Sequence, residues 1–400
     1  MRVGVLGAGA VGAYVGCLIH ARCPDADVIL VGRRALDERS GNGVVLETVG
    51  RCHPRVEIPR DHLRVTRDAA ALAGCDVVLV AVKSTSTADA AAQLARCPLP
   101  PDVVILSLQN GVGNAPTIAH ALARHHPSAT ILPCVVNMNV VWEGYADENA
   151  RVMTLRRCTP PKWGIPCVVV ADPSAEYPDD HPERRRRRVA AVNAAVATLR
   201  ARGAMRVALN AKVREALHSK LLVNLLSPIN ALARETVPKT LANRAGRLCW
   251  RALILEALDA YAAAGIRTRA PYVPILPSLL NLPDWAYAPL ERALFPLDPG
   301  CKSSMLQDVE SGRPTEMDAL GAEVVRLAAA NAARGERGSR TAAKDGRGTV
   351  APRNAAVAAL VRKLERGEIP GGRVPPEEVL VVIERAAAEA NERDETKSRD

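Results

Sequence analysis

Aromatic residues are scarce in this 400-residue chain, at 3% of its composition with a single phenylalanine. The four tryptophans are scattered along the sequence, which argues against a platform of stacked rings for single-stranded nucleic acid. No uncharged apolar run approaches the length of a membrane span, and Met1 leads directly into an apolar strand rather than a signal sequence. We therefore expect a soluble, cytoplasmic protein without a membrane partner.

The cysteines do not follow the spacing of a known metal site or disulfide framework. The 10 cysteines include no Cys-X-X-Cys pair, and no histidine stands at a zinc-like spacing from them. This pattern excludes a zinc ribbon and a dense disulfide framework. We expect free thiols in a reducing compartment and no bound metal.

The basic charge is not concentrated in one arm or stripe. The formal net charge is +10, but the arginines are spread through the chain. The arginine run 184–188 follows an acidic stretch and leads into an alanine-rich helix. A solvent-exposed helix face is therefore a simpler interpretation of this run than a nucleic-acid-binding patch. An anionic substrate and a phosphate-bearing cofactor account for the charge balance without a nucleic-acid partner.

The first half of the chain has the pattern of an α/β domain. Continuous β-branched runs are typical of strands that are buried on both faces of a parallel sheet, and here they alternate with helical segments. This predicts a doubly wound Rossmann sheet. The strands are expected at 2–6, 27–31, 77–82, 103–108, 131–141 and 166–171.

After about residue 205 the pattern changes to long helical periods, predicted at 211–233, 243–265, 303–311 and 315–334. We therefore predict two domains, 1–205 with an insertion near 143–190, and an all-helical domain over 206–400. The segment 335–348 is rich in glycine and charge, which predicts a flexible loop, and the end after residue 390 is polar.

A glycine-rich turn joins the first predicted strand to the first helix. In the sequence Gly7-Ala8-Gly9-Ala10-Val11-Gly12, the first glycine permits a tight turn, the second allows close approach of a pyrophosphate, and the third allows close helix–strand packing. The following helix N-terminus favours phosphate. These six residues are candidate dinucleotide contacts, although a glycine-rich turn without a ligand is the plainer alternative.

The end of the second strand indicates which dinucleotide binds. Enzymes that use NAD place an acidic residue there, whereas this chain has Gly32-Arg33-Arg34. Guanidinium groups can bind a 2′-phosphate bidentately, so NADP (NADPH) is favoured over NAD. Two exposed arginines in an arginine-rich chain are the alternative reading. Two further strand exits, at Lys83 and at Asn110, should meet the same crevice.

Three polar residues lie on one face of a predicted helix. Lys220, Asn224 and Ser227 stand at i, i+4 and i+7 among apolar residues, where burial without a purpose would be costly. A cleft wall explains them, although Lys220 could also extend its ammonium to water. Further along, Ser304 lies at the start of the helix predicted over 303–311, and Glu316 is predicted in the first turn of the next one, where an acidic residue is common for structural reasons alone.

Four motifs in order resemble the ketopantoate reductase family: GAGAVG at 7–12, QNGVGN at 109–114, KLLVN at 220–224, and SSMLQD with TEMD within 303–318. The resemblance implies a Rossmann domain followed by a helical domain like the C-terminal domain of 6-phosphogluconate dehydrogenase. It also implies NADPH-dependent reduction of 2-dehydropantoate to pantoate, with the chain acting as a monomer or homodimer.

The resemblance also implies residue roles. Lys220 would be the general acid, Asn224 and Ser304 would hold the substrate, and Asn110 would bridge substrate and cofactor. Glu316 would lie between substrate and cofactor, and Arg33 and Lys83 would contact the NADP phosphate.

Several features depart from the family pattern. The chain is about a hundred residues longer than a usual member, Cys301 replaces an asparagine that some members have, and Ser227-Pro228 follows the helix asparagine. Because these changes fall on the substrate side, a reductase of another branched 2-oxo acid is one alternative. A non-catalytic NADP-sensing or interaction protein is the other.

Overall fold

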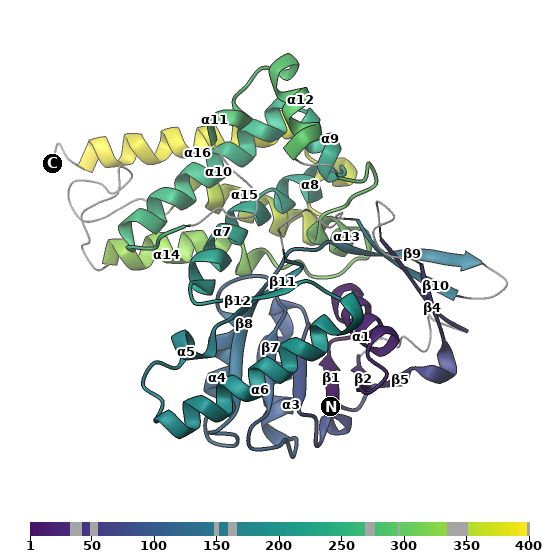
Figure 1. Ribbon diagram of the computed structural model, residues 1–400. Coiled ribbons are helices and arrows are strands. Elements are labelled where there is room, and N and C mark those ends of the chain that lie inside the picture. The colour runs from purple at the N-terminus through teal and green to yellow at the C-terminus, as the bar shows by residue number, and fades with distance from the viewer. Residues whose placement is uncertain are drawn as a thin grey trace. The chain divides into compact units, whose positions relative to one another are not determined.

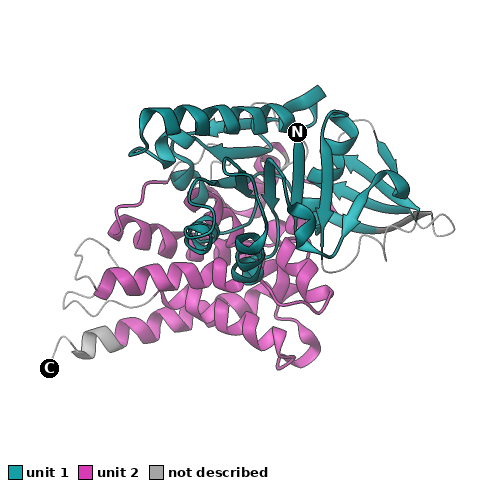
Figure 2. Ribbon diagram, turned by 90° about the horizontal axis from the view of Figure 1, so that it is seen from below, with its two compact units in different colours: residues 1–217 teal, residues 218–400 magenta. Residues whose placement is uncertain are grey.

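Buried apolar strands alternate with helices through the first half of the chain, as the sequence pattern predicts. The computed structural model describes residues 1–32, 42–48, 55–147, 152–158, 166–268, 277–294, 297–333 and 351–397. It divides into two compact units, residues 1–217 and residues 218–400 (Figure 2). Arg33, Arg34 and the predicted loop 335–348 lie outside the described residues.

The main sheet of the first unit has eight strands in the order β12-β11-β8-β7-β6-β1-β2-β5 (Figure 1). Strands β5 to β8 with β1 and β2 are parallel, whereas β11 runs antiparallel to β8 and parallel to β12. The order reverses at β1, which pairs with β2 on one side and β6 on the other. The bounds are β1 Arg2–Leu6, β2 Asp27–Val31, β5 Arg64–Thr66, β6 Val77–Val80, β7 Val104–Ser107, β8 Thr130–Val136, β11 Val168–Ala171 and β12 Val207–Asn210.

Helices cover both faces of this sheet, as β-branched strands that are buried on both sides require. Helix α1 (Ala10–Arg22) packs so closely that a side chain at Gly16 would collide with Leu30. Helix α6 (Pro182–Arg200) packs against β7 and β12, and α3 (Thr87–Arg96) and α4 (Asn114–Leu122) share an apolar core with the opposite face (Figure 1). The predicted fold of this half, an α/β sheet domain, is confirmed.

A second, smaller sheet was not predicted. It contains four strands in the order β4-β3-β10-β9, with β3 parallel to β10. The expectation of a single strand over 131–141 is therefore wrong, because β8 ends at Val136 and β9 then forms an edge strand of the smaller sheet. A parallel pair formed by distant segments leaves no local signal in the sequence. The bounds are β3 Gly43–Thr48, β4 Val56–Pro59, β9 Val140–Asp147 and β10 Val152–Arg157.

Every regular element that the structure describes in the second unit is a helix. Its core is centred on α10, with Trp250, Leu253 and Ala257 buried against the neighbouring helices. The bounds are α7 Val213–Asn224, which begins in the first unit, α8 Ser227–Ala233, α9 Val237–Ala242, α10 Arg244–Ala263, α11 Pro277–Leu280, α12 Asp284–Leu294, α13 Ser304–Glu310, α14 Gly321–Ala333, α15 Pro352–Glu365 and α16 Pro376–Lys397.

Two predicted helices differ from the observed ones. The helix expected over 211–233 is interrupted at Leu225 and Leu226, because Pro228 has no N–H to donate to the carbonyl group of Asn224 and its ring crowds that carbonyl. The helix expected over 315–334 begins only at Gly321. A separate short turn of 3-10 helix, Met317–Ala319, precedes it. No helix in the described ranges is long and apolar enough to cross a membrane.

Candidate active site

The glycine-rich turn of the first unit connects β1 to α1 and is held by backbone contacts. The N–H groups of Gly7 and Ala8 both donate to the carbonyl oxygen of Val31, at 2.8 and 2.9 Å. Gly7 has a φ of +105°, and a Cβ atom on it would stand 2.4 Å from the backbone nitrogen of Val82. A Cβ on Gly12 would stand 2.2 Å from the carbonyl oxygen of Gly7. These two glycines are therefore required by the turn itself.

Gly9 differs from its two neighbours. Its backbone angles are φ −79° and ψ −167°, which any residue can adopt, and a Cβ atom there would meet nothing within 4 Å. The protein's own packing therefore gives no reason for a glycine at this position. Gly9 is also the N-cap of α1, which has no side-chain cap and no acidic residue in its first turn. Open space beside an uncapped helix N-terminus fits the pyrophosphate of a dinucleotide.

The exits of β2 and β6 lie beside this turn, and the exit of β7 lies next to that of β6. Gly32, which directly precedes Arg33, is so close to Ala8 that its Cβ would stand 3.0 Å from the Cβ of Ala8. The contact between Gly7 and Val82 brings the exit of β6, and hence Lys83, to the same place. Leu108 after β7 donates from its backbone to Val80 at 2.8 Å. The predicted cofactor segments thus converge at the carboxyl ends of β1, β2, β6 and β7, although Arg33 itself is outside the described residues.

Asn110 lies at the first turn after β7. Its backbone carbonyl oxygen accepts a 2.6 Å hydrogen bond from Nδ2 of Asn114, the first residue of α4. The next residue, Gly111, has a φ of +93°, which is strained for any residue with a side chain. The local geometry therefore fixes the backbone on either side of the Asn110 side chain.

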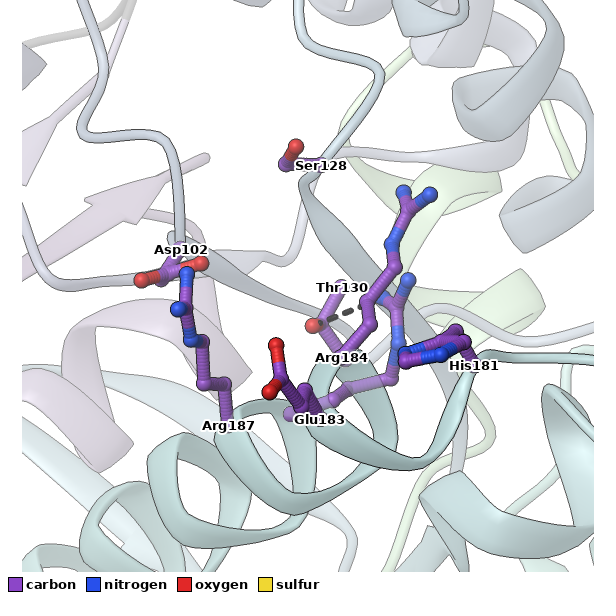
Figure 3. Close-up of a pocket in the computed structure, with 8 residues that line it drawn as sticks. Asp102, Ser128, Thr130, His181, Glu183, Arg184 and Arg187 are labelled. Carbon is purple, nitrogen blue, oxygen red and sulfur yellow. Dashed lines mark hydrogen bonds between the residues drawn. The ribbon is translucent and has the colours of Figure 1, made fainter.

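A separate pocket lies at the other end of the main sheet. Three of its lining residues are Asp102, which precedes β7, Thr130, which begins β8, and Arg184 of α6 (Figure 3). The amino ends of the strands, not their carboxyl ends, therefore border this pocket. Its cavity volume is about 250 Å³, and its most buried cation, Arg188, already donates to Asp180 at 2.7 Å and to Thr130 Oγ1 at 2.8 Å. This pocket is not the predicted dinucleotide site.

In the second unit, Lys220 lies on α7, where the residue as a whole is partly exposed but its ammonium group is buried. Burial lowers the pKa of its ammonium group below the usual value near 10.5, and a charge interaction with the Cys301 thiol partly opposes this shift. The hydroxyl of Ser303 donates to the carbonyl oxygen of Ser227, three residues beyond the end of α7. The structure thus brings the 301–304 segment to the end of the Lys220 helix, although the sequence separates them widely.

The two serines of this segment have different roles. Ser303 is the N-cap of α13, with its Oγ accepting from the backbone of Leu306 at 3.2 Å and donating to the carbonyl oxygen of Ser227 at 3.5 Å. Ser304 is the first residue of the helix and is partly exposed. Ser303 therefore ties the start of α13 to the start of α8, which leaves Ser304 as the member of the pair suited to a substrate. Asn224, the last residue of α7, is also partly exposed.

Glu316 does not lie where the sequence placed it. It precedes a short 3-10 turn rather than standing in the first turn of an α-helix, with φ −93° and ψ 29°. It is 4% exposed, in a buried strip with Thr315 and Met317. The explanation as an ordinary acid at a helix start is therefore wrong, because α14 begins only after this turn.

The sequence placed Gln109 in a candidate cofactor loop but gave no role to Thr87 or Asn114. All three side chains are buried, and Thr87 is hydrogen-bonded to both Gln109 and Asn114. Gln109 and Asn114 flank Asn110 within the QNGVGN motif, but their spacing alone does not reveal that they meet a threonine of another helix. Groups of His, Cys, Asp and Glu able to hold a metal ion are absent from the described residues.

Comparison with known proteins decides the family. The family model described as ketopantoate reductase PanE/ApbA matches residues 3–156, and the model for the C-terminal part of the same family matches residues 212–334. The chain belongs to the ketopantoate reductase family. This family comprises NAD(P)-dependent 2-oxo acid reductases that use a nicotinamide cofactor. Both sets of residues described above, the glycine turn and the Lys220 helix, fall within the matched ranges.

Two relatives of this ketopantoate reductase family member are named 2-dehydropantoate 2-reductase. The protein from Halobacterium salinarum is 36% identical over 138 residues, which are 33% of this chain and 40% of that protein. The protein from Mesorhizobium japonicum is 28% identical over 343 residues, which are 82% of this chain and 91% of that protein. The chain thus spans less than half of the first relative and most of the second.

Solved structures share the fold. A PanE/ApbA family ketopantoate reductase from Ralstonia eutropha has a TM-score of 0.62 at 24% identity, covering 92% of this chain and 99% of that one. D-mandelate dehydrogenase with NADH and anilino(oxo)acetate has a TM-score of 0.63 at 15% identity, with coverage of 92% and 99%. The order of a sheet domain and a helical domain is therefore that of ketopantoate reductase structures.

Proposed function

We propose that this chain is a 2-dehydropantoate 2-reductase, which reduces 2-dehydropantoate to pantoate with NADPH. The observation that carries the proposal is Lys220, which lies on α7 within the range matched by the C-terminal family model, and whose pKa burial lowers. The 301–304 segment bonds through Ser303 to Ser227, just beyond this helix, and the chain belongs to a family of 2-oxo acid reductases.

Lys220 is the general acid in this proposal. Bound NADPH supplies the hydride that the ketone carbon accepts. Negative charge then develops on the ketone oxygen, and the Lys220 ammonium stabilises that charge and donates a proton. A lowered pKa makes this transfer easier near neutral pH, because the pKa of the donor then lies closer to the pH of the reaction.

Asn224, Ser304 and Asn110 orient the substrate. Their neutral donors suit the carboxylate and hydroxyl of the acid, and holding the ketone in one pose supplies the entropic part of the rate enhancement. Glu316 lies between substrate and cofactor in this assignment. The six residues from Gly7 to Gly12 hold the pyrophosphate, and Gly9 has the open space that this contact needs.

Arg33 and Lys83 select the cofactor in this proposal, by contacting the 2′-phosphate of NADPH. Gly32, the residue before Arg33 in the sequence, packs against Ala8 of the dinucleotide turn. Replacement of Arg33 by serine should lower kcat/KM for NADPH by about 10-fold to 100-fold while that for NADH stays nearly constant, since a charge-assisted hydrogen bond contributes about 1.5–3 kcal/mol.

The proposal is tested by following NADPH absorbance with 2-dehydropantoate, in the wild type and in Lys220→Ala. Turnover is expected in the wild type, with kcat reduced at least about 100-fold in the variant, because general acid catalysis contributes about 10²–10⁴-fold. Absence of turnover in a wild type that binds NADPH, or full activity of Lys220→Ala, contradicts the assignment.

A second candidate is reduction of another branched 2-oxo acid. Cys301 and Ser227-Pro228 depart from the family pattern at positions that the resemblance assigns to the substrate side, and a structural neighbour with this fold is a D-mandelate dehydrogenase. Values of kcat/KM across a panel of 2-oxo acids separate the two candidates. Tight NADPH binding with no turnover of any acid would instead indicate a non-catalytic NADP-binding protein.

The setting of the enzyme is proposed on chemical grounds. The nine cysteines in the described ranges form no disulfide with one another, which supports a reducing compartment such as the cytoplasm. For the oligomeric state, both a monomer and a homodimer remain predictions.

A further inference from the structure

Four buried side chains form a continuous hydrogen-bonded relay beneath the Asn110 turn. Ser107 Oγ donates to Gln109 Oε1 at 3.1 Å, and Gln109 Nε2 donates to Thr87 Oγ1 at 2.7 Å. The hydroxyl of Thr87 in turn donates to Asn114 Oδ1 at 2.7 Å. These four side chains are between 3% and 7% exposed, so water contributes little to satisfying them.

The relay ends on the backbone of the predicted bridging residue. Asn114 Nδ2 donates to the carbonyl oxygen of Asn110 at 2.6 Å. That carbonyl can only accept, so it fixes the amide of Asn114 with its NH₂ group toward Asn110 and its oxygen toward Thr87. The single proton of Thr87 is then committed to Asn114, and Gln109 must present its NH₂ group to Thr87. Every bond in the relay therefore has one permitted direction.

The relay joins two of the strand exits that converge at the glycine turn. Thr87 is the first residue of α3 and follows directly on the short turn after Lys83. Gln109 and Asn114 belong to the exit of β7 on either side of Asn110. A hydroxyl at Thr87 is thus the only link of this relay that belongs to the Lys83 side.

We propose that Thr87 is a positioning residue, which holds the Asn110 turn in register with the Lys83 turn through Gln109 and Asn114. This inference rests on the proposed function, in which Asn110 meets both cofactor and substrate. Thr87 itself does not need to touch either molecule. Misplacement of a positioned group by about 1 Å can cost about 100-fold in rate, so the relay can affect catalysis without contributing a reacting group.

The test compares Thr87→Val with Thr87→Ser and with Thr198→Val. Valine keeps the shape and removes the hydroxyl, which leaves Gln109 Nε2 and Asn114 Oδ1 without their buried partner. Serine retains the hydroxyl. Thr198 is a matched control on α6, because among the residues that the structure describes its hydroxyl bonds to Ala194 of its own helix and to Met1.

Two measurements are made on each variant. The first is kcat and KM with NADPH and 2-dehydropantoate, where Thr87→Val should lower kcat by about 10-fold or more and Thr87→Ser should recover most of it. The second is amide hydrogen exchange by mass spectrometry, where peptides over 107–115 should exchange faster in Thr87→Val while peptides of α6 stay unchanged.

The outcomes distinguish this inference from the proposed function. A wild type without turnover contradicts the function, and the exchange of 107–115 still tests the relay. Wild-type exchange and kcat in Thr87→Val overturn the positioning role. Equal loss of kcat in Thr87→Val and Thr87→Ser, or accelerated exchange across the whole first unit, would show that Thr87 only supports folding and also overturns it.

Discussion

The indole Nε1 of Trp250 donates a hydrogen bond to the carbonyl oxygen of Leu222 at 2.9 Å, midway between Lys220 and Asn224 on α7. Trp250 is 1% exposed and lies on α10, so the central helix of the second unit holds the helix that carries the predicted acid. The position of Lys220 on α7 therefore depends on the contact that α10 makes with this helix.

Replacement of Trp250 by phenylalanine should destabilise the protein by about 1–3 kcal/mol, because the Leu222 carbonyl loses its buried donor. Thermal or urea denaturation measures this change. Trp285→Phe is the matched control: that ring is 82% exposed, and its replacement should change stability by less than about 0.5 kcal/mol. Equal effects of the two substitutions would contradict the role given to the Trp250 bond.

The glycines of the first turn should respond differently to alanine. Gly12→Ala places a Cβ against the carbonyl oxygen of Gly7 and should lower both the melting temperature and the affinity for NADPH. Gly9→Ala should fold with an unchanged melting temperature yet bind NADPH at least about 10-fold more weakly, because its methyl group would take up the open space that the proposed site leaves for the pyrophosphate. Fluorescence titration with NADPH and thermal denaturation separate the two effects. Normal NADPH affinity in a folded Gly9→Ala would argue against the dinucleotide site.

The pH dependence of the reaction should report Lys220. Burial lowers the pKa of its ammonium below the usual 10.5, and the protonated form is the one that donates. Activity should therefore be present at neutral pH and fall as the pH rises through this lowered pKa, which gives kcat an alkaline limb below 10.5. Lys220→Arg should retain little activity and lack that limb, because a guanidinium does not lose its proton in this range. An unchanged limb in that variant would assign it to another group.

The N-terminus of α15 should depend on Glu256. This carboxylate on α10 accepts from the backbone N–H groups of Arg353 and Asn354 at 2.9 and 2.8 Å, whereas the helix has no side-chain cap of its own. Glu256→Ala should cost at least about 1–3 kcal/mol in the free energy of unfolding, since buried donors lose their acceptor. Glu384→Ala serves as control, because its ion pair with Arg353 is exposed and should contribute at most about 1 kcal/mol. Denaturant unfolding of both variants provides the comparison.

Much of the candidate site could be predicted because its signals are local. A strand followed by glycines at fixed spacing constrains its own backbone, and Gly7 and Gly12 are required by contacts within a few residues or with the adjacent strand. The interruption at Pro228 could also have been predicted, since the missing N–H is a property of proline alone. The expectation of one helix over 211–233 gave this proline too little weight, because the apolar residues of the stretch recur strongly at helical spacing.

The sequence by itself determined the glycine turn, the buried strands around β1, the helical second half and the family, because each rests on short-range sterics, apolar periodicity or ordered motifs. Only the tertiary structure decided the second sheet, the burial of Glu316, the neighbourhood of Lys220 and Cys301, and the relay from Thr87 to Asn110. Those features arise from contacts between segments far apart in the chain, and such contacts depend on how complete elements pack.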